Sequence, residues 1–141
     1  MSAPRSKALN ISLWIAQIAV AVLYLQTLFF KFTAAPEAVW IFTQLGVEPW
    51  GRVATGAAEL IVALLLLVPM TAAIGAVMSL GVIAGAIVSH LAVLGIVVQN
   101  DGGTLFIMAL VIFFASTFIA WIRRDELPII GARFAVQPAR G

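Results

Sequence analysis

The sequence predicts an all-α integral membrane protein: a four-helix transmembrane bundle with a short interfacial helix between its first and second spans. Of the 141 residues, 63% are hydrophobic and 10% are charged, and the mean hydropathy is +1.13. Soluble domains contain about 45–50% apolar and about 25% charged residues, so this composition lies far outside their range. In addition, four stretches have the roughly 20 predominantly apolar residues that a membrane-crossing helix needs.

The four spans are predicted at residues 9–31, 52–69, 72–98 and 104–122. Pro69 stops the second span because proline cannot continue the backbone ladder of a helix. The polar and glycine-rich residues 99–103 are typical of a turn between the third and fourth spans. The charged run at residues 123–126 then ends the fourth span. These signals predict short connections and antiparallel neighbouring helices.

The segment FTAAPEAVWIFTQLGVEP, between the first two spans, is too short and too polar to cross a bilayer. Apolar residues recur in it at helical spacing, at Val39, Phe42 and Leu45. We therefore expect a short interfacial helix beginning after Pro36, with Trp40 and Trp50 at the level of the lipid headgroups.

The arrangement of basic residues predicts which side of the membrane each end faces. An even number of spans leaves both termini on one side, together with Arg5, Lys7, Arg123, Arg124, Arg133 and Arg140. Lys31 and Arg52 fall on the other side. Because cytoplasmic loops carry the excess of lysine and arginine, we expect both termini in the cytoplasm. The domain organisation that follows is a four-span domain at residues 1–126 and a cytoplasmic tail at residues 127–141. The apolar run from Ile11 to Phe30 exceeds the core of a cleaved signal peptide and is interpreted as a retained first span.

Several classes of site are disfavoured by composition. The chain has no cysteine, which excludes disulfides, thiolate metal sites and iron–sulfur ligation by its own residues. One histidine and six acidic residues leave little for a metal site, which usually needs three or four clustered ligands. We therefore predict no metal site and no covalently bound cofactor. The net charge of +2 is too small and too dispersed to indicate a nucleic-acid partner.

Two ionisable residues lie inside predicted spans: Glu59 in the second and His90 in the third. Such a group costs at least ~2.5 kcal/mol in the hydrocarbon, so it normally faces protein or water and marks a site. With a rise of 1.5 Å per residue, Glu59 is predicted about 10 Å and His90 about 13 Å below the same, outer end of the bundle. We take these two residues as the candidate catalytic residues.

Other polar residues are predicted at a similar depth. Asn10, Gln17, Tyr24 and Lys31 are seven residues apart and share one face of the first span, with Thr27 beside them. Arg52, Thr55 and Glu59 share a face of the second span. If these faces converge, they form a pocket in the outer half of the bilayer. The candidate ligand-binding residues are accordingly Tyr24, Lys31, Arg52 and Thr55.

Each of these residues also has a purely structural interpretation. Glu59 could pair with Arg52 or Lys31, or remain a neutral acid hydrogen-bonded between helices, and His90 could be a neutral imidazole that bridges helices. Lys31 could extend to the interface and Arg52 could anchor the second span there. The GxxxG sequence at residues 81–85 favours close packing within the bundle over a specific dimer.

The pattern resembles the DoxX-like membrane proteins over roughly residues 11–124. The resemblance is carried by a first span that closes with FFKF, a second span with GAAELIVALLLLVP, and a histidine late in the third span. The residues that match are Lys31, Gly56, Glu59 and His90. The family takes its name from a small subunit of thiosulfate:quinone oxidoreductase, and its members are linked to membrane redox and oxidative-stress responses. The resemblance implies a multi-pass protein of a bacterial inner membrane with a quinone as its candidate ligand.

Three functions remain open at this stage. In the first, the protein takes part in quinone-linked redox, and Glu59 and His90 bind the quinone headgroup and exchange protons with it. In the second, it is a non-catalytic membrane subunit that anchors or stabilises a larger complex with partner subunits, or a homo-oligomer. In the third, it is a small proton-coupled transporter with the same two residues as a proton relay.

Overall fold

The computed structural model describes residues 4–134, and within that range the regular structure is entirely helical. In chain order the elements are α1 (Lys7–Phe32), α2 (Pro36–Gln44), α3 (Trp50–Leu67), α4 (Ala72–Ser89), the π-helical segment η1 (His90–Leu94), α5 (Thr104–Ile122) and two short 3₁₀ turns, η2 (Arg124–Glu126) and η3 (Gly131–Arg133). Four of them, α1, α3, α4 continued by η1, and α5, are long and apolar enough to cross a membrane. The predicted four-span fold, with a short helix between its first two spans, is confirmed.

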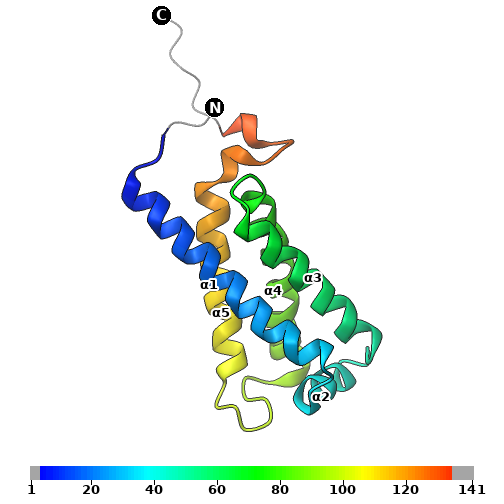
Figure 1. The fold of residues 1–141 in the computed structure, drawn as a ribbon. Helices are drawn as coiled ribbons and strands as arrows, with labels where there is room; N and C mark the ends of the chain where they lie inside the picture. The colour runs from blue at the N-terminus through cyan, green and yellow to red at the C-terminus, as the bar shows by residue number, and fades with distance from the viewer. Residues whose placement is uncertain (1–3, 135–141) are drawn as a thin grey trace, which may run out of the picture.

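The four long helices pack as a bundle in which α1 contacts both α3 and α5, while α4 contacts α3 and α5 (Figure 1). The turn between α3 and α4 contains Pro69, as predicted. Close packing of this hairpin requires a glycine at position 75. A Cβ atom there would lie 3.0 Å from the backbone nitrogen of Leu66 and 2.9 Å from the Cβ of Leu65. The α3–α4 hairpin is therefore held at a short interhelical distance.

The core and the surface of the bundle have the composition expected of a membrane protein. Buried residues from all four long helices form one apolar core, which includes Leu13, Val62, Ala76 and Ile119. Large apolar side chains also cover the exterior, among them Ile15, Leu64, Leu91, Phe114 and Trp121. An apolar exterior of this extent in a soluble monomer would promote association, whereas here it faces lipid. The chain is a multi-pass membrane protein in contact with the bilayer.

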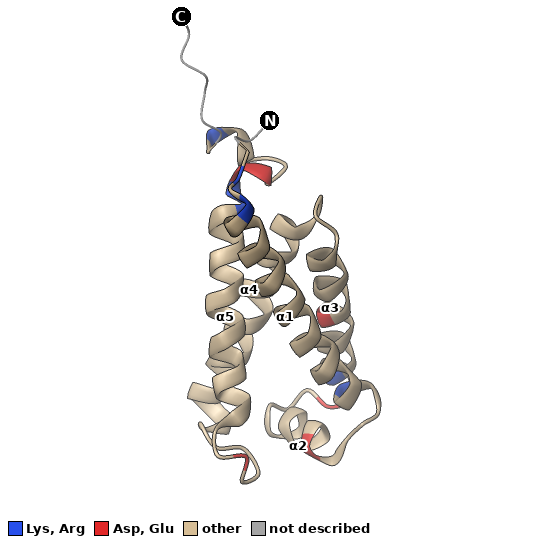
Figure 2. Ribbon diagram, turned by 60° about the vertical axis from the view of Figure 1, so that its left-hand side comes forward, with Lys and Arg blue, Asp and Glu red and all other residues tan. Residues whose placement is uncertain are grey.

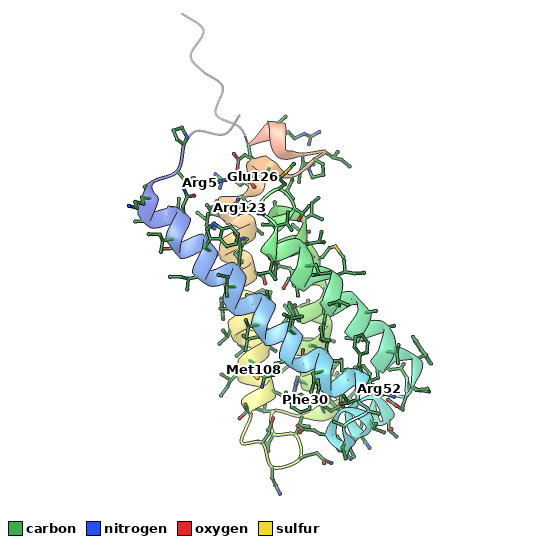
Figure 3. All side chains as sticks on the ribbon, in the orientation of Figure 1. Arg5, Phe30, Arg52, Met108, Arg123 and Glu126 are labelled. Carbon is green, nitrogen blue, oxygen red and sulfur yellow. The ribbon has the colours of Figure 1, made fainter. Side chains whose placement is uncertain are left out.

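Charged residues gather at the two ends of the bundle, with one acidic position part-way along α3 (Figure 2). At the end near the termini, Arg5 pairs with Asp125 and Glu126, and Glu126 also pairs with Arg123. Arg123 is buried and donates from Nε to the side-chain oxygen of Gln17 at 2.9 Å. Figure 3 shows Arg5, Arg123 and Glu126 together at this end, and Arg52 at the opposite end. This network fastens the N-terminal segment and α1 to the end of α5.

The third span differs from the prediction that it continues to residue 98. The α-helix ends at Ser89, η1 adds a single π-helical turn, and Gly95 then adopts a positive φ of 78°. The apolar residues that follow belong to a loop, in which Val98 is fully buried. Hydrophobicity alone gave no signal for this break because the residues that follow Gly95, Ile96 to Val98, are as apolar as those of the helix. His90 consequently lies at the start of the last turn, nearer the end of the span than predicted.

The prediction that the GxxxG sequence at residues 81–85 mediates close packing within the bundle is also wrong. Gly81 and Gly85 are exposed, and a Cβ atom at either position would have no neighbour within 4 Å among the described residues. Close packing on α4 uses Gly75 instead, one and a half turns earlier. Of the predicted tail, residues 127–134 form a turn that contains η3, and residues 135–141 lie outside the described range.

Candidate functional site

A cavity of about 360 Å³ lies among the helices in the half of the bundle farther from the termini. We call it the central cavity. Five of the six predicted site residues line it: Tyr24, Lys31, Thr55, Glu59 and His90. The rest of the lining is mostly apolar and comes from α2, the α2–α3 loop, α4, η1 and α5, with Phe42, Leu45, Val82, Ala86, Leu94, Met108 and Ile112 among its members. Its volume is within the range of small-molecule sites, about 300–1,000 Å³.

The charged centre of this site is the pair of Glu59 with Lys31. Lys31 Nζ lies 2.9 Å from Oε1 and 3.1 Å from Oε2 of Glu59, and the carboxylate side chain is only 7% exposed. The Thr27 hydroxyl is 3.0 Å from Glu59 Oε2. Lys31 therefore turns toward the carboxylate. The alternative interpretation, in which its side chain extends to the membrane interface, is wrong. Of the two cations considered for Glu59, the partner is Lys31.

Arg52 is at the same end of the bundle but outside the cavity lining. Its Nε lies 2.8 Å and 3.0 Å from the two carboxylate oxygens of Glu48, and its Nη1 donates to the backbone carbonyl of Lys31. That carbonyl belongs to the last turn of α1, where helix geometry leaves acceptors without partners. Arg52 thus ties the end of α1 to the start of α3 and supports the position of Lys31.

His90 has one ring nitrogen engaged and the other free. Nδ1 lies 2.8 Å from the carbonyl oxygen of Gly95, which can only accept, so Nδ1 carries a proton and Nε2 is left to exchange one. Nε2 has no hydrogen-bond partner within residues 4–134. In the same range, every side-chain nitrogen or oxygen atom that is fully buried does have a partner, so Nε2 is not fully buried. Nε2 is therefore accessible, and the residue lines the central cavity. The ring of Phe106 packs edge-on against the imidazole, with a centroid distance of 5.5 Å.

Tyr24 takes part in a chain of hydroxyl groups across three helices. Its hydroxyl lies 2.8 Å from that of Ser79 on α4, and Ser79 lies 2.7 Å from that of Ser116 on α5. All three side chains are fully buried or nearly so. This chain fixes the relative rotation of α1, α4 and α5 below the cavity, and it satisfies the Tyr24 phenol without a ligand.

Thr55 lines the cavity while its hydroxyl donates to the Gly51 carbonyl of its own helix, at 2.7 Å. Sequence reasoning missed Ser79 and Ser116 as polar partners because serine is common in apolar spans. It also missed Phe42 and Met108 as lining residues. A signal for Phe42 was present in the apolar periodicity of the interfacial segment, which brings that side chain under the bundle.

Two further features can be compared with the cavity: possible metal ligands and the phenylalanines of α5. Within the described residues, no group of three histidine, aspartate or glutamate side chains is placed to hold a metal ion. The phenylalanines of α5, at positions 106, 113, 114 and 118, lie outside the cavity lining. Of them, Phe106 contacts the site through His90.

Comparison with known proteins places the chain in a family. The model of the DoxX-like family matches residues 15–116, which is well over half of the sequence. The matched region contains all six predicted site residues, α1 from Ile15 onward, all of α2, α3 and α4, and α5 up to Ser116. No curated protein and no solved structure matches the chain. The chain belongs to the DoxX-like family.

Proposed function

We propose that this DoxX-like protein binds a quinone in its central cavity and takes part in quinone-linked redox in the outer half of a bacterial inner membrane. The observation that supports the proposal best is that His90, whose Nε2 has no hydrogen-bond partner within residues 4–134, lines a mostly apolar cavity together with the Glu59–Lys31 pair. A quinone headgroup is apolar apart from its two carbonyl oxygens. It requires an apolar cavity with a small number of hydrogen-bonding groups.

The protonation state of His90 suits this role. The Gly95 carbonyl holds the proton on Nδ1, so Nε2 can accept a hydrogen bond from a quinol hydroxyl or, when protonated, donate one to a quinone carbonyl. Imidazole is the side chain that exchanges protons most readily near neutral pH. Glu59 and Lys31 provide a second polar point on the wall of the same cavity. We propose that His90 passes the two protons one after the other, taking up a proton from the outer aqueous side between the transfers, and that the ion pair orients the headgroup.

The electrons have to come from another molecule. Quinone reduction takes up two electrons and two protons, and the chain has no cysteine and one histidine, so it lacks ligands of its own for an iron–sulfur cluster. We therefore propose that the protein is the quinone-binding subunit of an oxidoreductase and receives electrons from a partner subunit.

A second candidate function is a non-catalytic anchoring subunit. This function is favoured because the other polar side chains at the site already have hydrogen-bond or ion-pair partners within the protein. Glu59 is bonded to Lys31 and Thr27, and Tyr24 is bonded to Ser79. Such contacts are also what interhelical hydrogen bonds contribute to a membrane bundle without any ligand.

The deciding experiment measures quinone per protein after gentle purification from native membranes. The wild type is compared with His90→Gln, Glu59→Gln and, as a control, Asp125→Asn, which removes a carboxylate at the opposite end of the bundle. We expect near-stoichiometric quinone in the wild type and the control, and about tenfold weaker retention in the two cavity variants, a change equivalent to one lost hydrogen bond to the ligand.

Circular dichroism verifies that each variant is folded. His90→Gln retains the Glu59–Lys31 pair, so it remains informative if Glu59→Gln does not fold. Equal quinone in all four proteins would contradict the site assignment. A wild type that copurifies with a partner protein but without quinone would favour the anchoring subunit.

A further inference from the structure

A second cavity, of about 620 Å³, lies beside the central cavity and is bounded by α1, α2, the loop before α5, and α5 itself. We call it the side cavity. Thr27, Lys31, Ile41, Phe42, Leu105 and Met108 line both cavities, so Lys31 and its neighbours form the wall between them. Figure 3 shows Phe30 and Met108, which line the side cavity from α1 and α5, at the end of the bundle away from the termini.

The charges around the side cavity leave an excess of negative charge. Three charged residues line it: Lys31, Glu37 and Asp101. Lys31 is already neutralised by Glu59, with both carboxylate oxygens within 3.1 Å of Nζ. Glu37 is exposed and forms no ion pair or hydrogen bond through its side chain within residues 4–134. Two carboxylates therefore line the cavity without forming an ion pair among the described residues.

Backbone donors hold the carboxylate of Asp101 in place. Partial burial acts to raise the pKa of its carboxyl group, but the backbone N–H groups of Leu105, Val98 and Gly103 donate to it and hold that pKa below its ordinary value. These donors fix the carboxylate in the loop at the entrance to α5. The negative charge at this edge of the cavity is thus in a defined position.

The rest of the lining suits an organic cation in size and chemistry. Phe30 and Phe42 contribute aromatic rings, which provide a large apolar surface for the body of such an ion. Gln26 and Gln99 contribute amides with no hydrogen-bond partner within residues 4–134. Gln26 is exposed on a membrane-spanning helix, where a polar side chain facing lipid is unfavourable. A ligand with hydrogen-bond donors in the side cavity accounts for it.

We propose that the side cavity binds an amphipathic ammonium ion, with its charged group near Glu37 and Asp101 and its apolar part against Phe30, Phe42 and Met108. The charged end of this site is separate from the quinone site because Glu37 and Asp101 line only the side cavity, whereas Phe42 and Met108 line both cavities. The occupant is a diffusible amine with an apolar body, which reaches the cavity from the outer side of the membrane.

The test uses the methyl groups of the methionines as reporters in the purified full-length protein. The chain has four methionines, of which Met108 lines the side cavity, while Met70 and Met78 are exposed elsewhere. Isotope-labelled methionine gives one methyl resonance for each, and Met108→Leu assigns the reporter. Phenylbutylammonium is titrated against phenylbutanol, its neutral analogue, and phenylbutanoate, its anionic analogue, in a neutral detergent.

We expect the ammonium ion to shift the Met108 resonance saturably and to bind about tenfold more tightly than the alcohol, as one favourable charge interaction provides. Glu37→Gln should weaken its binding by about tenfold. The matched control is Glu48→Gln, which removes the same charge at the same end of the bundle from a residue that pairs with Arg52 outside the cavity. It should leave the affinity unchanged.

Equal affinities for the ammonium ion and the alcohol would overturn the proposal, as would an equal loss of affinity in the Glu37 and Glu48 variants. A final comparison identifies the source of the ammonium group. The titration is repeated in nanodiscs of phosphatidylglycerol, with and without phosphatidylethanolamine. Competition by phosphatidylethanolamine would assign the site to a lipid headgroup and would contradict the proposal that its occupant is a diffusible amine.

Discussion

The buried pair of Glu59 and Lys31 concentrates the electrostatic free energy of the site in two side chains. Each charge loses most of its hydration inside the bundle, and the attraction between them offsets that loss only while both are present. Lys31 lies in the last turn of α1, and Glu59 lies midway along α3. The pair therefore joins the two helices on which the wall between the cavities depends.

We predict that Lys31→Met and Glu59→Gln each reduce the free energy of unfolding by about 3–5 kcal/mol, because each leaves one charge buried without its partner. The double variant should recover part of this loss, with a coupling energy of about 1–3 kcal/mol. Unfolding of the detergent-solubilised proteins, followed by circular dichroism, measures all four states of the cycle. Additive effects of the two substitutions would show that the charges do not interact.

His90 illustrates what sequence patterns establish for single residues and what they leave undetermined. An imidazole in an apolar span indicated a polar site, and the residue does line a cavity. Its depth was wrong because the helix ends at Gly95, which adopts a positive φ, although the residues that follow are still apolar. Likewise, the spacing of seven brings Gln17 and Tyr24 inward but leaves Asn10 exposed.

At the scale of the helices, turn signals were more informative than hydrophobic length. Pro69 and the glycines before α5 gave the connections correctly, because they restrict the backbone locally. The choice of Lys31 over Arg52 as the partner of Glu59 could not be predicted, because it depends on the rotation of α1 against α3. Arg52 instead engages Glu48, one turn earlier in the chain.

The glycines of α4 differ in their packing: Gly75 lies against α3, whereas Gly81 and Gly85 contact no other helix among the described residues. We predict that Gly75→Ala destabilises the protein by about 1–3 kcal/mol, because its methyl group would overlap the backbone of α3. Gly81→Ala places the same methyl group where no atom of the described residues lies within 4 Å, so its effect should stay within about 0.5 kcal/mol. Thermal unfolding of the two variants in the same detergent provides the comparison.

A loss in Gly81→Ala as large as that in Gly75→Ala would mean that position 81 is covered in the assembled protein. Since the exposed glycines lie on the outer side of α4, a second copy of the chain would then be the first partner to examine by crosslinking. Equal tolerance at both positions would instead show that the α3–α4 hairpin can separate without loss of stability.

At the scale of the whole molecule, the two ends of the bundle differ in charge and in what they do. The end near the termini contains Arg5, Arg123 and the acidic residues that bind them, and its network is structural. The other end contains α2 and both cavities. The membrane side that each end faces therefore determines from which compartment the two cavities are reached.

We predict that both termini are cytoplasmic, because the excess of basic residues lies at their end. The chain has no cysteine, so single cysteines can be introduced without background. Gln44→Cys at the end of α2 should react with a membrane-impermeant maleimide in intact spheroplasts, whereas Ile129→Cys, at a position that is 91% exposed, should react only after permeabilisation. The opposite labelling pattern would show that the protein has the inverse orientation in the membrane, with both termini outside. Both cavities would then open toward the cytoplasm, and protons exchanged at His90 would come from that side.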